Sequence, residues 1–235
     1  MNKVRIVIAG GGAAGHKLAY ALQQEAEVTL IDPKPFYEMP LAAPRLFVAP
    51  RELPAIMPYA EFLPKVHFIE GTLESVASGQ VTARETNDKG SRIAYDLALW
   101  CLGTKPDAQY MKANYPETLN DRGEIQVEST LRVKGLANVF ALGDVADFKE
   151  KGAAWAGFQG RIVAANLRAL MKQGPGAALN KYKLPMADTS IVLTLGRYNG
   201  VAQLPFVVTT WPWLLRKLKS QTMGVPSARK AIGLS

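Results

Sequence analysis

Hydrophobic and polar positions along the chain form a pattern that predicts strands and helices in alternation. The apolar run that starts at Val4 and the run Val28–Asp32 are rich in β-branched residues, and short uninterrupted runs of this kind are typical of strands buried on both faces. Residues 66–73, 95–105 and 138–144 repeat this character. Because helix-forming segments separate several of these runs, the pattern predicts an α/β fold with a central parallel sheet.

Other segments depart from this pattern. Residues 81–94 alternate around an Asn-Asp-Lys-Gly turn and predict a small antiparallel β meander. Residues 152–172 place apolar side chains on one helical face and end before Gly-Pro-Gly. We therefore expect a Rossmann-like domain over residues 1–176 with a β-hairpin insert at about 78–96. A C-terminal β-hairpin and a basic amphipathic tail would follow over residues 177–235.

A glycine-rich turn joins the first predicted strand to the following helix. Gly10, Gly12 and Gly15 have GxGxxG spacing, in which the glycines permit a tight turn, close approach of backbone N–H groups to a pyrophosphate, and close helix packing. The helix N-terminus would face the phosphates with its partial positive charge. Asp32 ends the second strand, where its carboxylate can accept hydrogen bonds from adenosine ribose hydroxyls. Together these features predict a dinucleotide site.

Composition narrows the function classes. The single cysteine, Cys101, excludes an internal disulfide and a redox-active CxxC pair, which argues against a disulfide reductase. With two histidines and no ligand cluster at metal-binding spacing, we predict no metal site. The first strand begins at Val4 and no apolar run reaches the length of a membrane span, so we expect a cytoplasmic, soluble chain without a signal peptide.

The net charge of +8 is concentrated near the C-terminus: six basic and no acidic residues follow Asp188. Within this stretch, Trp211 to Lys219 combines two tryptophans, a leucine cluster and three cations, which fits a short interfacial helix on an anionic membrane surface. The alternative is a terminal helix packed on the body of the protein or on a second subunit, as in a homodimer. The apolar content argues against nucleic acid as a partner.

The GxGxxG turn and a late hydrophobic strand that ends in Gly143-Asp144 resemble the two-part FAD signature of pyridine-nucleotide-disulfide-reductase-like flavoproteins. Within that superfamily the chain is similar to the apoptosis-inducing-factor-like, ferroptosis-suppressor class of NAD(P)H:quinone oxidoreductases. The segments that carry this resemblance are Ile31–Lys34, Ala43–Arg45, Trp100–Lys105, Leu131–Gly135, Asn138–Asp144 and Leu195–Gln203.

The resemblance implies FAD as cofactor, electron transfer through its isoalloxazine, and a quinone-like acceptor. Asp144 would bind the ribityl chain and Trp155 would lie near the flavin, while Arg45 is either a cation beside the cofactor or a solvated loop residue. No side-chain acid or base is demanded, so we name no catalytic residue. The implied cofactor-binding residues are Gly10, Gly11, Gly12, Ala13, Ala14, Gly15, Asp32, Pro33, Lys34, Arg45, Leu73, Cys101, Leu102, Gly103, Gly143, Asp144 and Trp155.

One departure from the family pattern concerns the electron donor. Its members carry a second Rossmann unit for NAD(P)H with its own GxGxxG, whereas this sequence has one such motif and residues 71–103 are too short for another unit. We therefore expect an FAD domain without the nicotinamide domain. Two functions stay open: a membrane-associated oxidoreductase peripheral to the inner face of a membrane, and a non-catalytic FAD-binding or membrane-surface module. NAD in place of FAD would leave Gly143-Asp144 without a role.

Overall fold

A computed structural model describes residues 3–42, 46, 49, 52–85, 90–100, 108–148, 151–183, 191–195, 197–204 and 206–234. The chain divides into two compact units, and each unit is formed by two separate stretches of sequence. The larger unit contains Met1–Tyr37 and Pro58–Tyr182, and the smaller unit contains Glu38–Met57 and Lys183–Ser235.

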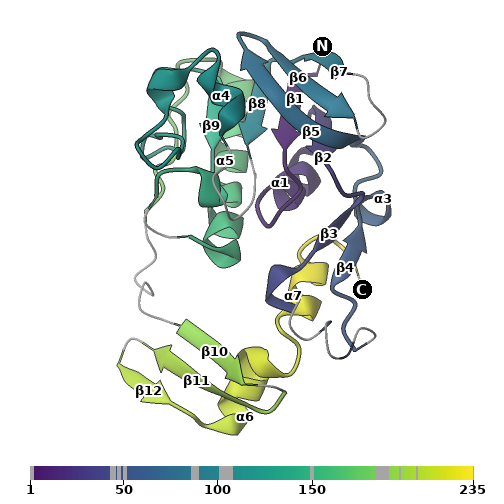
Figure 1. The fold of residues 1–235 in the computed structure, drawn as a ribbon, viewed down its shortest axis with the longest axis vertical. Coiled ribbons are helices and arrows are strands. Elements are labelled where there is room, and N and C mark those ends of the chain that lie inside the picture. The colour runs from purple at the N-terminus through teal and green to yellow at the C-terminus, as the bar shows by residue number, and fades with distance from the viewer. Residues whose placement is uncertain are drawn as a thin grey trace. The chain divides into compact units, whose positions relative to one another are not determined.

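The larger unit is built on a seven-stranded sheet in the order β7-β6-β5-β2-β1-β8-β9 (Figure 1). Its parallel strands are β1 (Arg5–Ala9), β2 (Glu27–Asp32), β5 (His67–Ala77), β8 (Leu97–Trp100) and β9 (Val139–Ala141). The second half of β5 pairs antiparallel with β6 (Gln80–Glu85), which pairs with β7 (Gly90–Ala94). The predicted α/β class, with a parallel sheet and an antiparallel meander, is confirmed.

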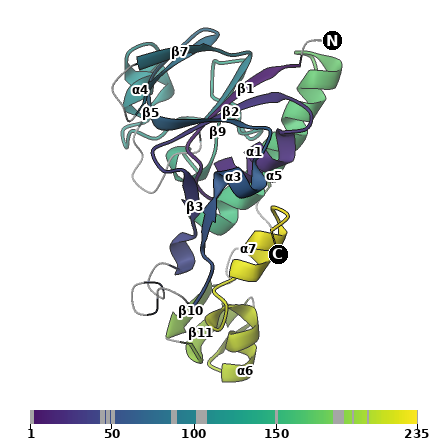
Figure 2. The same cartoon turned by 90° about the vertical axis from the view of Figure 1, so that its right-hand side faces the viewer.

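Both faces of the parallel sheet are buried. Helix α1 (Gly15–Leu22) packs against α5 (Ala153–Gln173) beside the sheet (Figure 2). Val7 belongs to a core with Ile31 and Met111, the last from α4 (Gln109–Lys112). Ile6 and Ile8, fully buried, point to the opposite face because side chains alternate along a strand. Burial on both faces accounts for the uninterrupted apolar runs.

Short elements complete the larger unit. α3 (Tyr59–Phe62) leads toward β5, and two 3₁₀ turns, η2 (Pro116–Thr118) and η3 (Gly143–Val145), flank the last parallel strand. β3 (Phe36–Glu38) and β4 (Ile56–Pro58) form a separate two-stranded sheet where the chain passes between the units.

The smaller unit contains a three-stranded antiparallel sheet of β10 (Ile191–Leu195), β11 (Asn199–Leu204) and β12 (Val207–Thr209). α6 (Pro212–Leu215), a π-helical turn η4 (Arg216–Ser220) and α7 (Val225–Lys230) follow, and the 3₁₀ turn η1 (Pro40–Ala42) comes from the N-terminal stretch. β10 and β11 pair over the residues predicted to form a hairpin. Among the helices that the structure describes, none is long and apolar enough to cross a membrane.

Candidate dinucleotide site

The glycine-rich turn is fastened to the end of the neighbouring strand. Gly10 adopts a positive φ of 93°, which favours glycine, and its N–H donates to the carbonyl of Ile31 at 2.8 Å. The next N–H, of Gly11, donates to Oδ2 of Asp32 at 2.6 Å. Oδ1 of Asp32 accepts from the N–H of Lys34 at 2.9 Å. The Asp32 carboxylate therefore holds the backbone at the carboxyl ends of β1 and β2 together.

The position between the first two motif glycines is also restricted to glycine. The hydroxyl of Tyr59 donates to the carbonyl of Gly11 at 3.0 Å, and a Cβ added at Gly11 would lie 1.9 Å from that hydroxyl oxygen. Tyr59 is buried, so it has little room to move aside. The GxGxxG pattern allows any residue at position 11. In this protein glycine is required there because the side chain of Tyr59 occupies the space that a Cβ would need.

His16 also contacts the glycine-rich turn, through the carbonyl of Gly12. Its ring is fully buried, stacks on Tyr37 with centroids 3.9 Å apart, and places Nδ1 2.6 Å from the carbonyl oxygen of Gly12. Because a carbonyl only accepts, Nδ1 carries the proton. Burial lowers the pKa of His16 to about 4, so the ring is neutral near pH 7.

Asp32 keeps acceptor capacity for a ligand. Burial raises its pKa, and the N–H groups of Gly11 and Lys34 act in the opposite direction. Each carboxylate oxygen has two lone pairs, and the two backbone contacts use one on each oxygen. The remaining lone pairs suit ligand hydroxyl groups, which is the role predicted for this residue.

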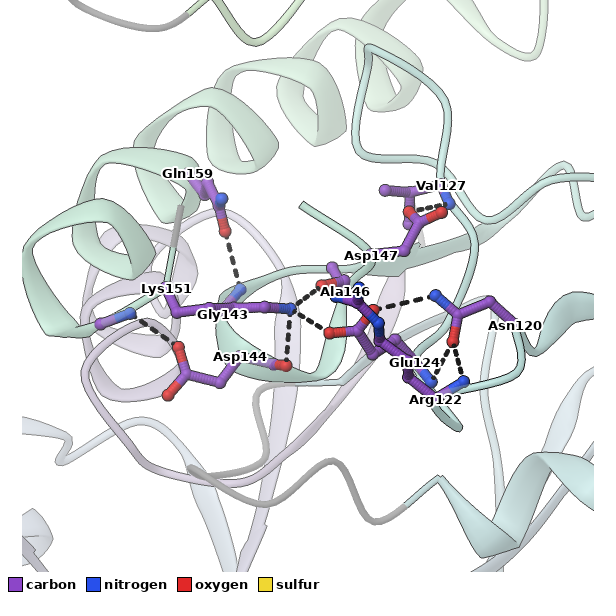
Figure 3. Close-up of polar contacts among 11 residues, drawn as sticks. Asn120, Arg122, Glu124, Val127, Gly143, Asp144, Ala146, Asp147, Lys151 and Gln159 are labelled. Carbon is purple, nitrogen blue, oxygen red and sulfur yellow. Dashed lines mark hydrogen bonds and ion pairs between the residues drawn. The ribbon is translucent and has the colours of Figure 1, made fainter. Parts of the chain in front are cut away.

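The second half of the site is the loop between β9 and α5, which Figure 3 shows with its polar contacts. Oδ1 of Asp144 accepts from the N–H of Gly152 at 2.7 Å, directly before α5. The N–H of Gly143 donates to Oε1 of Gln159 at 2.7 Å. The first residues of this loop, Gly143 and Asp144, are thus fixed to α5 and to the residue directly before it.

Lys151 forms further contacts that hold this loop in place (Figure 3). Its Nζ donates to the carbonyls of Asp144 at 3.1 Å and Ala146 at 2.5 Å, and it forms an ion pair of 2.8 Å with Oε1 of Glu124. Asn120 donates to the other oxygen of Glu124 at 2.8 Å. Burial acts to raise the pKa of Glu124, but the hydrogen bonds from Lys151 and Asn120 outweigh it and lower that pKa. Sequence reasoning missed Lys151 and Glu124, which no motif joins.

The two halves meet where α1 packs on α5. A Cβ added at Gly160 of α5 would lie 3.5 Å from the carbonyl oxygen of Ala14, so the third turn of α5 and the GxGxxG turn are in close contact. Lys17, in the first turn of α1, has its Nζ 2.8 Å from where a Cβ of Gly157 would lie. Burial, and then the positive charge of Arg161, lower the pKa of Lys17. Two cations therefore flank the contact between the two helices, a setting that favours an anionic ligand.

The structure brings most of the predicted residues to these two loops. The run from Gly10 to Gly15 and the run from Asp32 to Lys34 follow β1 and end β2, and Gly143 and Asp144 follow β9. Trp155 is half-buried in the first turn of α5. Leu73 is half-buried against the sheet core, opposite Ala83 in the antiparallel part of β5. Arg45, Cys101, Leu102 and Gly103 lie outside the described residues.

This arrangement, a glycine turn and an acid after β1 and β2 with a Gly-Asp loop after β9, is typical of Rossmann-like dinucleotide-binding proteins. Residues 65–166 match the family model of the pyridine nucleotide-disulphide oxidoreductases. Ferroptosis suppressor protein 1 of Mus musculus is 32% identical over 206 residues, which cover 85% of this chain and 53% of that protein. Apoptosis-inducing factor homolog B of Dictyostelium discoideum is 30% identical over 139 residues, 59% of this chain and 35% of that protein.

Solved structures share the fold at low sequence identity. NDH2 from Plasmodium falciparum, solved in complex with NADH, superposes with a TM-score of 0.69 at 10% identity over 92% of this chain and 93% of that one. The sulfide:quinone oxidoreductase from Aquifex aeolicus gives a TM-score of 0.61 at 10% identity over 97% of this chain and 94% of that one.

These findings confirm the predicted resemblance: the chain is similar to the pyridine nucleotide-disulphide oxidoreductases over residues 65–166 and to ferroptosis suppressor protein 1 over 85% of its length. This resemblance agrees with FAD as the predicted cofactor and with an oxidoreductase as the predicted class. The chain spans about half the length of the mouse relative it matches.

Proposed function

We propose that this chain binds FAD and works as a quinone-reductase-like oxidoreductase. The observation that carries the proposal is that the GxGxxG turn with Asp32 and the Gly143–Asp144 loop follow parallel strands of one sheet and approach each other where α1 packs on α5. The carboxyl edge of a parallel sheet is where α/β proteins bind their ligands. Bound FAD would supply the electron-transfer chemistry in its isoalloxazine ring.

The proposed residue roles follow from position and donor type. The N–H groups from Gly12 to Gly15, at the positive end of α1, would face the diphosphate. Asp32 would accept hydrogen bonds from the adenosine ribose, and Asp144 from the ribityl chain. The residues present fit this group, since glycines leave the turn open, and Asp32 keeps unused acceptor sites.

The donor and acceptor are also proposals. One solved neighbour is a sulfide:quinone oxidoreductase, which supports a quinone-like acceptor for this chain. Another was solved with NADH, which is an electron donor. The sequence has a single GxGxxG, so we do not expect fast reduction by NADH from this chain alone. The competing proposal is a module in which FAD is a structural ligand and no turnover occurs.

We further propose that the chain is cytoplasmic and touches the inner face of a membrane through the tail surface, defined as Phe206, Val208, Trp211 and Trp213. These apolar side chains are 100%, 66%, 58% and 64% exposed, respectively. Arg216, Lys217 and Lys219 follow directly. Exposed aromatics beside cations suit an anionic lipid surface. A homodimer contact through this surface is the alternative.

The first experiment is a visible absorption spectrum of the purified protein, before and after excess NADH without oxygen. We expect a flavin spectrum that NADH leaves largely unchanged. Photochemical reduction followed by a soluble ubiquinone analogue should then restore the oxidised spectrum faster than air does. A colourless protein that does not take up added FAD would contradict FAD binding, and slow reoxidation by the quinone would favour the non-catalytic module.

A further inference from the structure

The side-chain amide of Gln159 in α5 is buried, and among the described residues only its oxygen has a hydrogen-bond partner. The residue is fully buried, and its Oε1 accepts the hydrogen bond from the N–H of Gly143 at 2.7 Å. Its Nε2 has no hydrogen-bond partner among the described residues. The orientation of the amide is fixed by Gly143, because a backbone N–H requires the oxygen. A buried amide nitrogen without an acceptor is unfavourable.

Gln159 lies between the two halves of the proposed site, which are the GxGxxG turn and the Gly143 loop. Ala156, Gln159 and Gly160 occupy one face of α5, since residues three and four apart share a face. A Cβ added at Gly143 would lie 3.6 Å from Cβ of Ala156, and one added at Gly160 would lie 3.5 Å from the carbonyl oxygen of Ala14. Gln159 therefore contacts the Gly143 loop (Figure 3), while its neighbour Gly160 contacts the GxGxxG turn.

The surroundings favour a ligand that is negatively charged and only accepts hydrogen bonds. The N-terminus of α1 carries the N–H groups and partial positive charge that bind phosphates. Nζ of Lys17 lies 2.8 Å from where a Cβ of Gly157 in α5 would be, and the nearby positive charge of Arg161 adds to the lowering of the pKa of Lys17. A phosphate oxygen accepts hydrogen bonds and donates none when ionised, which matches the unused donor of Gln159.

We propose that Nε2 of Gln159 donates a hydrogen bond to a phosphate oxygen of the FAD diphosphate. Gln159 then has two functions: its oxygen holds the N–H of Gly143, and its nitrogen binds the cofactor. This inference rests on the proposed binding of FAD and adds a side-chain contact to the diphosphate, which GxGxxG turns contact through the backbone.

The decisive variant is Gln159→Glu. It keeps an acceptor for the N–H of Gly143 and replaces only the donor nitrogen with a second oxygen of similar size. We expect the dissociation constant for FAD, measured by flavin fluorescence with the apoprotein at pH 8, to rise about 100-fold. Gln173→Glu, which makes the same change at the exposed end of α5, should stay within about twofold of the starting protein.

ADP is the second probe, because it carries the diphosphate without the ribityl chain. The Gln159→Glu substitution should weaken ADP competition by a factor similar to its effect on FAD. Weakened FAD binding with unchanged ADP binding would place the acceptor on the ribityl chain and overturn the phosphate assignment. If the unsubstituted protein binds neither ligand, the proposed function itself fails, which is a separate outcome.

A buried glutamate can impair folding, so the thermal unfolding of each apoprotein must be compared by circular dichroism. If Gln159→Glu does not fold, Gln159→Met is the second variant, because it preserves volume and introduces no charge; it also removes the acceptor for the N–H of Gly143, so its ADP binding is compared with its FAD binding. We expect this variant to bind FAD about tenfold more weakly. Equal FAD affinity of a folded Gln159→Glu or Gln159→Met variant and the unsubstituted protein would overturn the proposal.

Discussion

Three buried side chains determine the shape of the glycine-rich turn. Asp32 accepts the N–H of Gly11, Tyr59 donates to its carbonyl, and His16 lies 2.6 Å from the carbonyl of Gly12. All three side chains are buried, so their contacts with the backbone are shielded from water and strengthened. The turn is therefore shaped by residues outside the motif as well as by its glycines.

The pKa of His16 predicts acid sensitivity. The folded-state pKa of about 4 lies below the ordinary value of 6.5, so protonation favours the unfolded state. The stabilising contribution of the neutral ring is complete above pH 6.5 and is lost as the pH falls toward 4. We expect this group alone to lower the free energy of unfolding by up to about 3 kcal/mol over that interval. Urea unfolding at several pH values measures the change.

His16→Phe is the matched variant, because a phenyl ring can still stack on Tyr37 but does not titrate. Carboxylates contribute to the pH dependence of both proteins, so the difference between the two curves isolates the imidazole. The variant should be less stable at pH 7.5, since it loses the contact with Gly12, yet it should lose less stability on acidification. Parallel curves would contradict the assignment.

At the residue scale, the sequence predicted what a local motif defines. Gly10, Gly12, Gly15 and Asp32 follow from spacing and strand ends. The role of Tyr59 beneath Gly11 did not follow, because 48 positions separate the two residues and only the folded chain brings them together.

The loop between β9 and α5 depends on a single lysine. Lys151 bonds two carbonyls of the loop and the carboxylate of Glu124, while Asp144 and Gln159 hold the loop to α5. A side chain that joins two carbonyls of an irregular loop to a carboxylate outside it reduces the conformations available to the loop. Lys151 is accordingly a positioning residue for Asp144.

Lys151→Met should loosen this loop while retaining most of the aliphatic chain. The lysine is about one-third exposed, so we expect a modest loss of about 1 kcal/mol in the free energy of unfolding. Amide hydrogen exchange over residues 143–148 should become faster, and FAD should dissociate faster. Lys172→Met, at the exposed C-terminal end of α5, is the control. Equal exchange rates in the two variants would show that Lys151 does not order the loop.

At the element scale, the long and strongly apolar segments were predictable. The five parallel strands and α5 follow from β-branched runs and from helical periodicity. β12, α7 and the pair β3 and β4 were not predicted, because these short segments lie outside the apolar runs and glycine motifs that identified the parallel strands. The ion pair between Lys151 and Glu124 could not be predicted from the sequence, because charged residues are common in loops and no motif links these two.

The tail surface gives a prediction for the whole molecule. Substituting both Trp211→Ser and Trp213→Ser removes two exposed aromatic rings that stack with centroids 6.3 Å apart. If this surface binds a membrane, co-sedimentation with vesicles of phosphatidylcholine and phosphatidylglycerol should fall about tenfold or more. Added salt should weaken binding of the unsubstituted protein, because cations flank the surface.

Ile56→Ser is the control for the membrane experiment, since Ile56 is 49% exposed and lies outside the tail surface. It should bind vesicles as the unsubstituted protein does. Vesicle binding that survives the double tryptophan substitution would count against membrane contact and would favour protein packing, which analytical ultracentrifugation can detect as a concentration-dependent dimer.

At this largest scale the sequence was least informative about how the chain is divided. No composition shift separated residues 38–57 from the N-terminal segment, although they belong to the smaller unit. An ion pair of 3.1 Å between Glu52 and Arg197, and the approach of Met39 to Gly224, join them to the later stretch. Contacts between such distant segments leave no local pattern.

The discontinuous smaller unit has a consequence for synthesis on the ribosome. Residues 38–57 are made early, but their partners in 183–235 appear only after all of residues 58–182. At typical elongation rates, this interval is on the order of ten seconds. Apolar side chains such as Met39 and Met57 are buried in the folded protein. During this interval they lack the contacts with residues 183–235 that complete their packing. A nascent chain in that interval is a natural client for chaperones that cover apolar segments.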